Sequence, residues 1–247
     1  MSNWVEGRVV SKHCWTDRLF SLEIDAAIDD FKAGQYVKVG LDVDGTRVGR
    51  PYSCVNAPHK RPIEIYFNEV SEGPLTPRLS TLDPGDQVWV SSRASGIFTL
   101  DNIPDARYLW LFATGTALGV YLSMLATEEP WGRFERIVLI HGARISAELA
   151  YRERIAGICE KRPTDFSYLP VLSREAFPDA LPGRIPALLA SGEIEQRAGT
   201  RLEAETSHVM LCGNSHMIGD MKVLLEARGL KRHRRHEPGH YTTEQYH

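Results

Sequence analysis

Arginine and serine side chains follow apolar segments in the second half of the 247-residue chain, where they can bind a phosphate group. Arg144 follows RIVLIHGA, Ser173 and Arg174 end SYLPVLSR, and Arg184 comes later in LPGRIP. A guanidinium fork matches a phosphate dianion in charge and geometry. Two such contacts, at about 1.5–3 kcal/mol each, would favour NADP over NAD by a factor of roughly 100 or more. The alternative is that these arginines are solvated surface residues.

A short turn, ATGTALG at 113–119, joins an apolar segment to a helical one. Small residues at such a turn let backbone N–H groups approach a phosphate at the positive end of a helix. The turn is not GxGxxG, because Ala113 stands in place of the first glycine. We interpret it as a phosphate loop; the alternative is that Gly115 and Gly119 only permit a tight strand–helix turn.

The first half carries two further candidate motifs. RPYS, which ends at Ser53, places a cation, a rigid ring, an aromatic ring and a hydroxyl within four residues. On an extended chain Arg50 and Tyr52 point to one face and Ser53 to the other. GPLTPRL at 73–79 combines a glycine that permits close backbone approach with Thr76, which can cap the following turn. Alone, the first motif is an ordinary strand entry and the second a capped helix start.

Two halves with different patterns must position these motifs. Up to about residue 101, short alternating segments separated by turn residues predict a small antiparallel β-barrel or sandwich; the expected strands are EGRVVSK, RLFSLEI, QYVKVGLDV, PIEIYFNEV and DQVWVSS. From about residue 107, four apolar runs, each followed by a helical segment, predict a doubly wound parallel-sheet α/β domain. Its ligand crevice is expected at the carboxyl ends of the strands. The domains are therefore expected at 1–101 and 107–247.

The composition excludes several classes of protein. With 43% hydrophobic residues, 25% charged residues and a formal net charge of -3, the chain is typical of a globular protein and gives no global reason to expect nucleic acid. Its four cysteines form no CxxC pair, so we expect no metal, iron–sulfur cluster or disulfide framework. No apolar run approaches the roughly 20 residues of a membrane span, and the N-terminus lacks a signal-peptide pattern. We expect a cytoplasmic protein.

Taken in order, RPYS, GPLTPRL, ATGTALG, VLSRE and LCGN resemble the ferredoxin–NADP reductase family, and most closely its bacterial flavodoxin/ferredoxin members. The similarity extends over essentially the whole chain. It implies that 1–101 is the FAD-binding domain, that 107–247 is the NADP-binding domain, and that FAD binds between the halves. It also implies an oxidoreductase that transfers electrons between NADP(H) and ferredoxin or flavodoxin.

The resemblance also implies cofactor contacts residue by residue. Arg50 faces the FAD pyrophosphate, Tyr52 stacks on the isoalloxazine, and Ser53 lies near flavin N5. The residues expected to bind FAD are Arg50, Pro51, Tyr52, Ser53, Tyr66, Phe67, Asn68, Pro74, Leu75, Thr76, Thr116, Tyr246 and His247. Those expected to bind NADP are Thr114, Gly115, Ala143, Arg144, Ser173, Arg174, Arg184, Gly213 and Asn214. His247 departs from the family, whose closest members end in an aromatic residue that lies over the adenine.

We expect the cofactors to supply the chemistry, with a hydride passing between nicotinamide and flavin N5 and single electrons passing to the carrier. The protein must then orient the cofactors and exclude water, without an acid–base dyad. The candidate catalytic residues are Ser53, Tyr52 and Cys212. We interpret Cys212 as a positioning residue rather than a nucleophile; the alternative is a small hydrophobe in a buried strand.

A basic run, RGLKRHRRH at 228–236, contrasts with the balanced overall charge. Such runs are typical of solvated helix ends. Our sharper hypothesis is that it helps to dock a small acidic carrier, ferredoxin or flavodoxin, by electrostatic steering. We expect a monomer that binds neither nucleic acid nor a membrane, and we interpret His141 as an ordinary strand residue.

Three other functions are open on the sequence alone. The first is an NAD(P)H–flavin reductase or oxygenase-type reductase of the same superfamily. The second is an NADP dehydrogenase with an accessory β-domain and no flavin, and the third is a regulatory nucleotide-binding module without turnover. Flavin bands in the visible spectrum that NADPH bleaches faster than NADH would favour the reductase.

Overall fold

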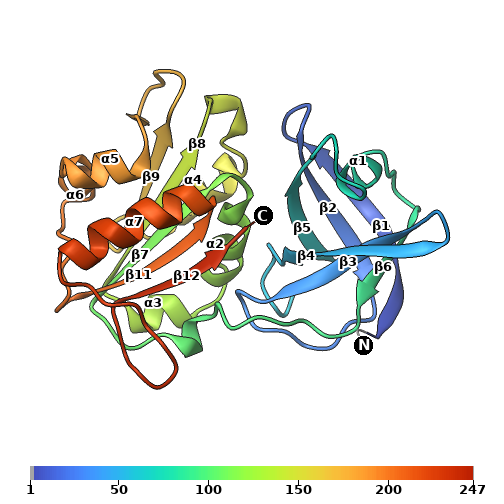
Figure 1. Ribbon diagram of the computed structural model, residues 1–247, viewed down its shortest axis with the longest axis horizontal. Coiled ribbons are helices and arrows are strands. Elements are labelled where there is room, and N and C mark those ends of the chain that lie inside the picture. Colours follow the sequence, from blue (N-terminus) through green and yellow to red (C-terminus); the bar gives the residue numbers. More distant parts are fainter. Residues whose placement is uncertain (1–2, 247) are drawn as a thin grey trace. The chain divides into compact units, whose positions relative to one another are not determined.

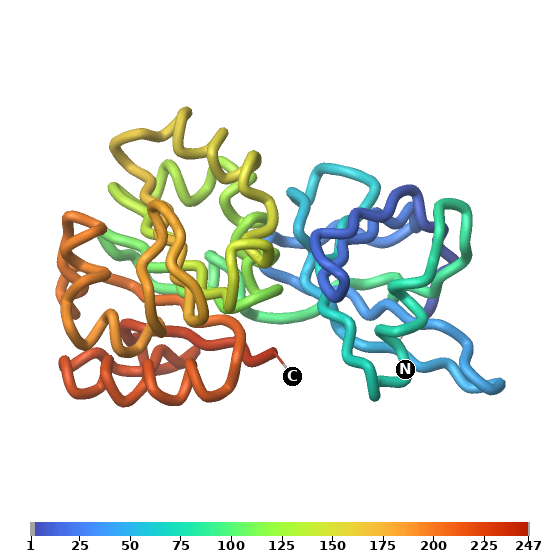
Figure 2. The backbone as a smooth tube through the Cα atoms, turned by 90° about the horizontal axis from the view of Figure 1, so that it is seen from above, coloured from blue at the N-terminus to red at the C-terminus, as the bar shows by residue number. Residues whose placement is uncertain are grey.

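The computed structural model describes residues 3–246, which form two compact units (Figure 1). The first unit contains the chain up to Leu100 together with a returning segment, Gly119–Thr127. The second contains Asp101–Leu118 and the chain from Glu128 onward. The backbone trace in Figure 2 follows the extended segment that leads from the first sheet to the second.

The first unit is built around a six-stranded antiparallel sheet with the strand order β4-β3-β6-β1-β2-β5. Its strands are β1 (Trp4–Cys14), β2 (Leu19–Ala26), β3 (Tyr36–Val43), β4 (Thr46–Ser53), β5 (Ile63–Asn68) and β6 (Gln87–Ser91). A short helix, α1 (Thr76–Leu79), follows β5. The expected antiparallel half is confirmed, and it contains one strand, β4, that the alternation of apolar residues did not predict.

A tight hairpin sets how β4 lies against β3. Asp44 and Gly45, the two residues between these strands, both have positive φ, 50° and 77°. A two-residue Asp-Gly loop of this kind has a twist that matches its flanking strands and determines their register. The resulting register places Tyr52 opposite Val37. The position of RPYS on the sheet therefore follows from a turn several residues away.

Alternate strand residues form the core of the first unit. Val37 and Val39 of β3 are fully buried, whereas Lys38 between them is exposed. The same core contains fully buried residues from the other strands and from α1, among them Leu22, Ile24, Ile63, Ile65, Leu79, Val88 and Val90. Each such side chain contributes about 1.5–3 kcal/mol through burial. β4 joins this core through the partly buried Val48 and Tyr52.

The second unit is built around a six-stranded parallel sheet with the strand order β10-β9-β8-β7-β11-β12. Its strands are β7 (Tyr108–Thr114), β8 (Arg136–Ala143), β9 (Phe166–Leu172), β10 (Leu181–Pro182), β11 (Ser207–Gly213) and β12 (Tyr241–Gln245). From β7 the chain builds outward to β10 and then returns to place β11 on the other side of β7. In sheets of this kind ligands bind at the carboxyl ends of the strands beside such a reversal. The topology therefore directs attention to the ends of β7 and β11.

Helices cover both faces of this sheet, which confirms the doubly wound fold. The helical segments are η1 (Leu100–Asn102), η2 (Gly115–Ala117), α2 (Leu118–Leu125), α3 (Glu129–Arg133), η3 (Ser146–Glu148), α4 (Arg152–Lys161), α5 (Ile185–Ala190), α6 (Glu193–Ala198) and α7 (Ser215–Ala227). Side chains of α5, α6 and α7 pack on one face against Trp110, Phe112, Val138 and Ile140 (Figure 1). The strands are buried on both faces, which explains their continuous apolar runs.

The packing of helix α2 could not be predicted from its apolar pattern. Its residues are apolar nearly all round and are almost completely buried. Its Ser123 hydroxyl donates to the Asn56 carbonyl at 2.8 Å, and a Cβ built on Gly119 would lie 3.0 Å from Val55 Cγ2. Most of this helix therefore packs within the first unit, although it directly follows the turn at the end of β7.

Within residues 3–246, no helix has both the length and the apolar character that crossing a membrane requires.

Candidate functional site

The RPYS motif occupies the end of β4 in the first unit. Arg50 and Tyr52 lie opposite Val39 and Val37, so both belong to the face that points toward the core, whereas Pro51 is exposed. Arg50 is exposed, and its Nη1 donates to the Gly49 carbonyl at 2.9 Å. The Tyr52 ring meets the Phe67 ring edge-on, with 6.0 Å between the ring centroids. Ser53, the last residue of the strand, is buried.

The hydroxyl of Tyr52 fits a bound ligand. Its oxygen is buried and has no hydrogen-bond partner among the described residues. Burial raises the pKa of this phenol, with the Arg50 charge opposing the shift, so the group remains a neutral donor. A buried donor without a partner loses about 1–3 kcal/mol of stability, which a cofactor oxygen placed here would restore. The unpartnered hydroxyl is therefore the group on β4 that a bound ligand could satisfy.

The YFN segment ends the neighbouring strand β5. Tyr66 and Phe67 are both buried, and Asn68 is exposed. Phe67 stacks on Phe20 with 5.7 Å between the ring centroids. Phe67 therefore packs in the core, while Tyr66 packs beside Gly119, whose built Cβ would lie 3.7 Å from Tyr66 Cβ.

Thr76 does not cap a helix, contrary to the expectation from GPLTPRL. Leu75 holds the N-cap position and is buried, and Thr76 is the first residue of α1. The Thr76 hydroxyl instead accepts the Val70 N–H at 2.9 Å, while Arg78 donates to the Pro74 carbonyl at 2.7 Å. These bonds close the loop before α1, and leave backbone N–H groups as its means of binding an anion.

The turn after β7 contacts the end of β11, as the topology predicts. The Thr114 hydroxyl accepts the Asn214 N–H at 2.8 Å, across one hundred residues of sequence. Gly213 has φ +129°, and a Cβ there would lie 2.1 Å from Thr114 Oγ1, so only glycine fits. Beside them Gly115 has φ +56° and no atom within 4 Å of its built Cβ, which leaves open space above the turn. Thr116 is half-buried in η2.

Asn214 has a structural task that its sequence motif did not reveal. It is the N-cap of α7, and its side-chain oxygen accepts the N–H groups of His216 and Met217 at 2.9 and 3.3 Å. Its side chain is therefore engaged in capping the helix, a contribution of about 1 kcal/mol.

Arg144 and Arg174 are brought together at the carboxyl ends of β8 and β9. The Ser173 N–H donates to the Ala143 carbonyl at 3.1 Å, and the Arg174 N–H donates to the Arg144 carbonyl at 3.0 Å. Both arginines are exposed. Arg184 joins them, because Gly183 donates to the Leu172 carbonyl at 2.8 Å and Arg184 follows as the N-cap of α5.

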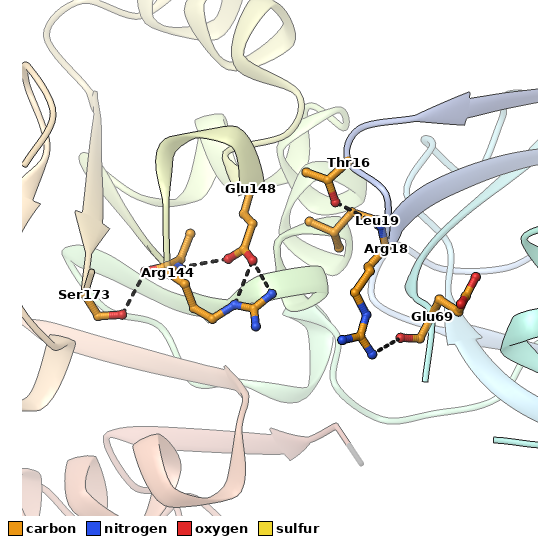
Figure 3. Close-up of polar contacts among 8 residues, drawn as sticks. Thr16, Arg18, Leu19, Glu69, Arg144, Glu148 and Ser173 are labelled. Atoms are coloured by element: carbon orange, nitrogen blue, oxygen red, sulfur yellow. Dashed lines mark hydrogen bonds and ion pairs between the residues drawn. The ribbon is translucent and has the colours of Figure 1, made fainter. Parts of the chain in front are cut away.

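Glu148 holds Arg144 and was not predicted. Its carboxylate accepts the Arg144 backbone N–H at 2.9 Å and the guanidinium Nε at 2.7 Å (Figure 3). Arg144 and Glu148 are four residues apart, the separation of a common ion pair, so the spacing was a usable signal. Ser173 lies close by and points its hydroxyl toward the Ala143 carbonyl.

Cys212 lies in β11 between Ala113 of β7 and Glu244 of β12. It is completely buried, and burial raises the pKa of its thiol far above the usual value, with the Glu244 charge adding to the shift. A neutral buried thiol is a poor nucleophile, which supports a positioning role. Glu244 was missed by the sequence reasoning: its Oε2 is buried without a partner among residues 3–246, and burial raises its pKa to about 7.

The C-terminal segment is ordered by pairing rather than frayed. β12 runs parallel to β11, and the Tyr246 N–H then donates to the Gly213 carbonyl at 3.1 Å. Tyr246 is thereby held beside the same glycine that contacts Thr114. His247 lies outside the described residues.

The basic run forms a hairpin at the amino ends of the strands, opposite to the ends that carry the candidate site. Arg234 and Glu237 exchange backbone hydrogen bonds, and the strand that follows begins opposite Val209. The hairpin thus lies at the amino ends of the strands, roughly 13 Å or more along β11 from Gly213. Arg228 is tied down separately, because it donates to Glu195 at 3.0 Å. The run does not adjoin the turn after β7.

Each unit matches a family model. Residues 8–96 match the oxidoreductase FAD-binding domain, and residues 111–222 match the oxidoreductase NAD-binding domain. The antiparallel sheet and the parallel sheet thus match the two domains of an FAD-dependent oxidoreductase that uses a nicotinamide nucleotide.

Full-length relatives narrow this class. The flavodoxin/ferredoxin–NADP reductases of Shigella flexneri and Escherichia coli (strain K12) are each 46% identical over 247 residues, covering 100% of both chains. A ferredoxin NADP+ reductase from Neisseria gonorrhoeae, solved with bound FAD and NADP, matches with a TM-score of 0.93 at 29% identity over 99% of each chain. The chain belongs to the flavodoxin/ferredoxin–NADP reductase family and is an enzyme that uses FAD and NADP(H). The resemblance stated from the motifs, the fold class and the cofactors are confirmed.

Proposed function

We propose that this enzyme transfers electrons between NADPH and a flavodoxin or ferredoxin, by hydride transfer between nicotinamide and flavin N5 and one-electron exchange with the carrier. The names of the full-length relatives support these carriers. The observation that carries the choice of NADPH is the backbone bond between Arg174 and Arg144, which brings two exposed arginines together at the carboxyl ends of β8 and β9. A cytoplasmic location and a monomeric state stay predictions.

The first unit supplies the FAD contacts along β4. Tyr52 would lie against the flavin ring and gain a partner for its hydroxyl, Arg50 would face the pyrophosphate, and Ser53 would lie near flavin N5. Further contacts are assigned to Tyr66, Phe67, Asn68, Pro74, Leu75, Thr76, Thr116 and Tyr246. When bound, FAD accepts two electrons as a hydride and releases them singly, which suits a one-electron carrier.

The second unit supplies the NADP contacts beyond its strand ends. Thr114 and Gly115 would hold the pyrophosphate with backbone N–H groups, over the open space beside Gly115. The 2′-phosphate would be bound by Ala143, Arg144, Ser173, Arg174 and Arg184. Gly213 and Asn214 would border the nicotinamide.

Cys212 would act by position. Its neutral thiol fills the end of β11 without charge, and Gly213 beside it leaves the space that Thr114 occupies, so that β7 and β11 lie close together where the nicotinamide would be held. Orientation of this kind can contribute up to roughly 7–11 kcal/mol to lowering the barrier. Replacement of Cys212 by alanine should reduce the hydride-transfer rate while leaving NADP+ affinity nearly unchanged. An unchanged hydride-transfer rate would remove Cys212 from the catalytic residues.

The basic hairpin would act on the carrier at a distance. Because it lies at the amino ends of the strands, we assign it long-range steering rather than contact at the cofactor. The triple variant Arg232→Gln, Arg234→Gln and Arg235→Gln should slow carrier reduction several-fold at low salt and leave ferricyanide reduction unchanged. Equal salt dependence of the two reactions in the parent enzyme would argue against steering.

The proposed function is tested by the spectrum and by carrier titration. The purified enzyme should show flavin bands that NADPH bleaches faster than NADH. NADPH oxidation should then rise with added flavodoxin or ferredoxin until it saturates. A colourless preparation that fails to bind added FAD, or an oxidation rate indifferent to both carriers, would contradict the proposal.

A further inference from the structure

His141 is a completely buried imidazole in the middle of the parallel sheet. It lies on β8, between Ala113 of β7 and Pro170 of β9. Its Nε2 is 3.3 Å from the Gly115 carbonyl oxygen, and its Nδ1 is 3.2 Å from the Tyr168 hydroxyl. Both ring nitrogens are therefore used, and one of them contacts the turn after β7.

The hydrogen bonds allow one tautomer of this ring. A carbonyl oxygen only accepts, so Nε2 must carry the hydrogen and donate it to Gly115. Nδ1 then has a lone pair, which accepts the hydrogen of the Tyr168 hydroxyl. Burial raises the pKa of Tyr168, so its hydroxyl keeps that hydrogen. The chain of donors runs from Tyr168 through His141 to Gly115.

The carbonyl that His141 binds controls the peptide group on which an anion would rest. The Gly115 carbonyl and the Thr116 N–H belong to one planar peptide unit and point in opposite directions. Holding the carbonyl toward the sheet interior turns the Thr116 N–H away from it. The same carbonyl accepts the Leu118 N–H, so it also joins the turn to α2.

We propose that His141 is a positioning residue for the nucleotide-binding turn, which fixes the peptide between Gly115 and Thr116 so that its N–H meets the NADP pyrophosphate. The inference rests on the proposed role of this turn, and it adds the backbone N–H of Thr116, a residue assigned above to FAD, to the N–H groups of Thr114 and Gly115. It goes beyond that role by assigning the shape of the turn to a side chain on a different strand, one that touches no cofactor.

The state of the imidazole should make NADP binding sensitive to acid. Burial lowers the pKa of His141 to about 4, against opposing effects of the Gly115 carbonyl and the Glu148 carboxylate. Tyr168 faces the other ring nitrogen, and the charges of Arg152 and Cys159 act on Tyr168 in turn. A proton on Nδ1 would turn this acceptor into a donor, so the bond to Tyr168 would have to reverse and the Tyr168 hydrogen would lose its acceptor. NADP+ affinity should therefore fall as the pH drops below about 5.

The test compares two replacements of His141 in the FAD-containing enzyme. His141→Leu removes both hydrogen bonds and should raise the NADPH KM and the NADP+ Kd about tenfold, with kcat for ferricyanide reduction within twofold. His141→Gln keeps an N–H near Nε2 and should recover most of the affinity. It should also lose the fall in affinity at acid pH. Because the 2′-phosphate titrates in every variant, the ratio of the affinities isolates the effect of the imidazole.

Tyr168→Phe removes a single hydroxyl and carries the test if His141→Leu does not fold. It should raise the NADPH KM two- to fivefold and remove the fall in affinity at acid pH. An unchanged KM in Tyr168→Phe, with the fall in affinity at acid pH retained in both Tyr168→Phe and His141→Gln, would overturn the proposal.

His208→Leu is the matched control, because His208 is the other buried histidine of this sheet and its Nε2 lies 3.5 Å from the Thr242 hydroxyl, away from the turn. It should lower the melting temperature without changing the NADPH KM. An equal rise in KM in both leucine variants would mean a structural effect only.

Gly115→Val tests the turn itself. If Gly115→Val raises the NADPH KM and His141→Leu does not, His141 has no positioning role. If neither variant raises the KM, the turn is not the nucleotide-binding site.

Discussion

In the first unit the residues proposed for FAD lie along a strand, whereas in the second the residues proposed for NADP lie beyond the ends of strands. Arg50 and Tyr52 take their positions from the pairing of β4 with β3. Thr114, Arg144 and Gly213 take theirs from backbone contacts between the ends of neighbouring strands. The difference follows from the type of sheet. An antiparallel sheet can leave one face open to a ligand, whereas a parallel sheet covered by helices on both faces leaves only the ends of its strands open.

This contrast determines how each site should respond to mutation. At the edge of the parallel sheet, backbones approach so closely that one added methyl group is not accommodated. On β4, function depends on single polar atoms of side chains, so replacements that keep the shape should have smaller and more selective effects.

The largest effect is expected for Gly213→Ala. The new methyl group would lie 2.1 Å from Thr114 Oγ1 at a residue with φ +129°. Overpacking and backbone strain together should lower the free energy of unfolding by about 3 kcal/mol and abolish NADP+ binding. Urea unfolding and an NADP+ titration measure the two effects.

Gly157→Ala is the control for that variant. Gly157 lies within α4, and its built Cβ has no atom within 4 Å. The replacement should stabilise the protein by about 0.5–1 kcal/mol and leave NADP+ binding unchanged. If both alanine variants were equally stable, the close contact at Gly213 would be unimportant.

Acid should weaken the second unit, which holds both buried histidines of the described chain. Burial lowers the pKa of His141 to about 4 and that of His208 to about 3. The unfolded chain, with histidine pKa values near 6.5, then binds more protons than the folded one below that pH. Stability should be complete above about pH 6.5 and fall toward pH 4, by on the order of 3 kcal/mol for each histidine.

Glu244 acts with the opposite sign. Burial raises its pKa to about 7, so between about pH 4.5 and 7 the folded state keeps a proton that the unfolded state has lost. The stability that this proton contributes is lost as the pH rises from about 4.5 to 7. Two histidines outweigh one carboxyl group, so the net stability should still rise from pH 5 to pH 7. Urea unfolding across this range measures the slope, and His208→Gln should reduce it. A flat profile in the parent protein would contradict the shifted histidine pKa values.

Arg174→Ala should alter the choice of nucleotide. Loss of one charged contact to the 2′-phosphate should lower kcat/KM for NADPH about tenfold and leave kcat/KM for NADH unchanged. Steady-state kinetics with both nucleotides give the ratio. Arg93→Ala, which removes an exposed arginine paired with Asp29 in the first unit, should change neither value. Equal losses with NADH and NADPH would remove Arg174 from the phosphate site.

The smallest effect is expected for Tyr52→Phe, and its sign should depend on FAD. Without FAD the variant loses a buried, unpartnered hydroxyl and should gain about 1 kcal/mol of stability. With FAD it loses a hydrogen bond, so FAD should bind roughly threefold to tenfold more weakly. Unfolding with and without FAD and an FAD titration measure both effects.

Tyr241→Phe is the control in the second unit, because the Tyr241 hydroxyl donates to Glu226 at 2.5 Å. It should lower stability whether or not FAD is present. If Tyr52→Phe behaved in the same way, its hydroxyl would not be part of the FAD site.

Three strands escaped the sequence pattern. β10 has two residues and is too short to show a pattern, and β4 and β12 escaped for other physical reasons. β4 contains Gly49, Arg50 and Pro51, which disfavour a strand, but it lies at the edge of its sheet, where a proline needs no partner for its missing N–H. β12 is short and polar, and it becomes a strand because β11 offers an unpaired edge beside it. β4 carries Tyr52, which is proposed for the FAD site, so local propensity was weak where a proposed binding residue lies.

The sequence by itself determined the chemistry available at each strand end, the Asp-Gly turn that sets the β3–β4 register, and the division into an antiparallel and a parallel half. These properties depend on residues that are neighbours in the sequence, so the spacing of apolar residues and the turn type indicate them. Only the tertiary structure decided that Thr114 binds the backbone at Asn214, that Glu148 holds Arg144, and that His141 binds the turn after the adjacent strand. Such contacts depend on which strands become neighbours, and a local pattern carries no information about pairing across a hundred residues.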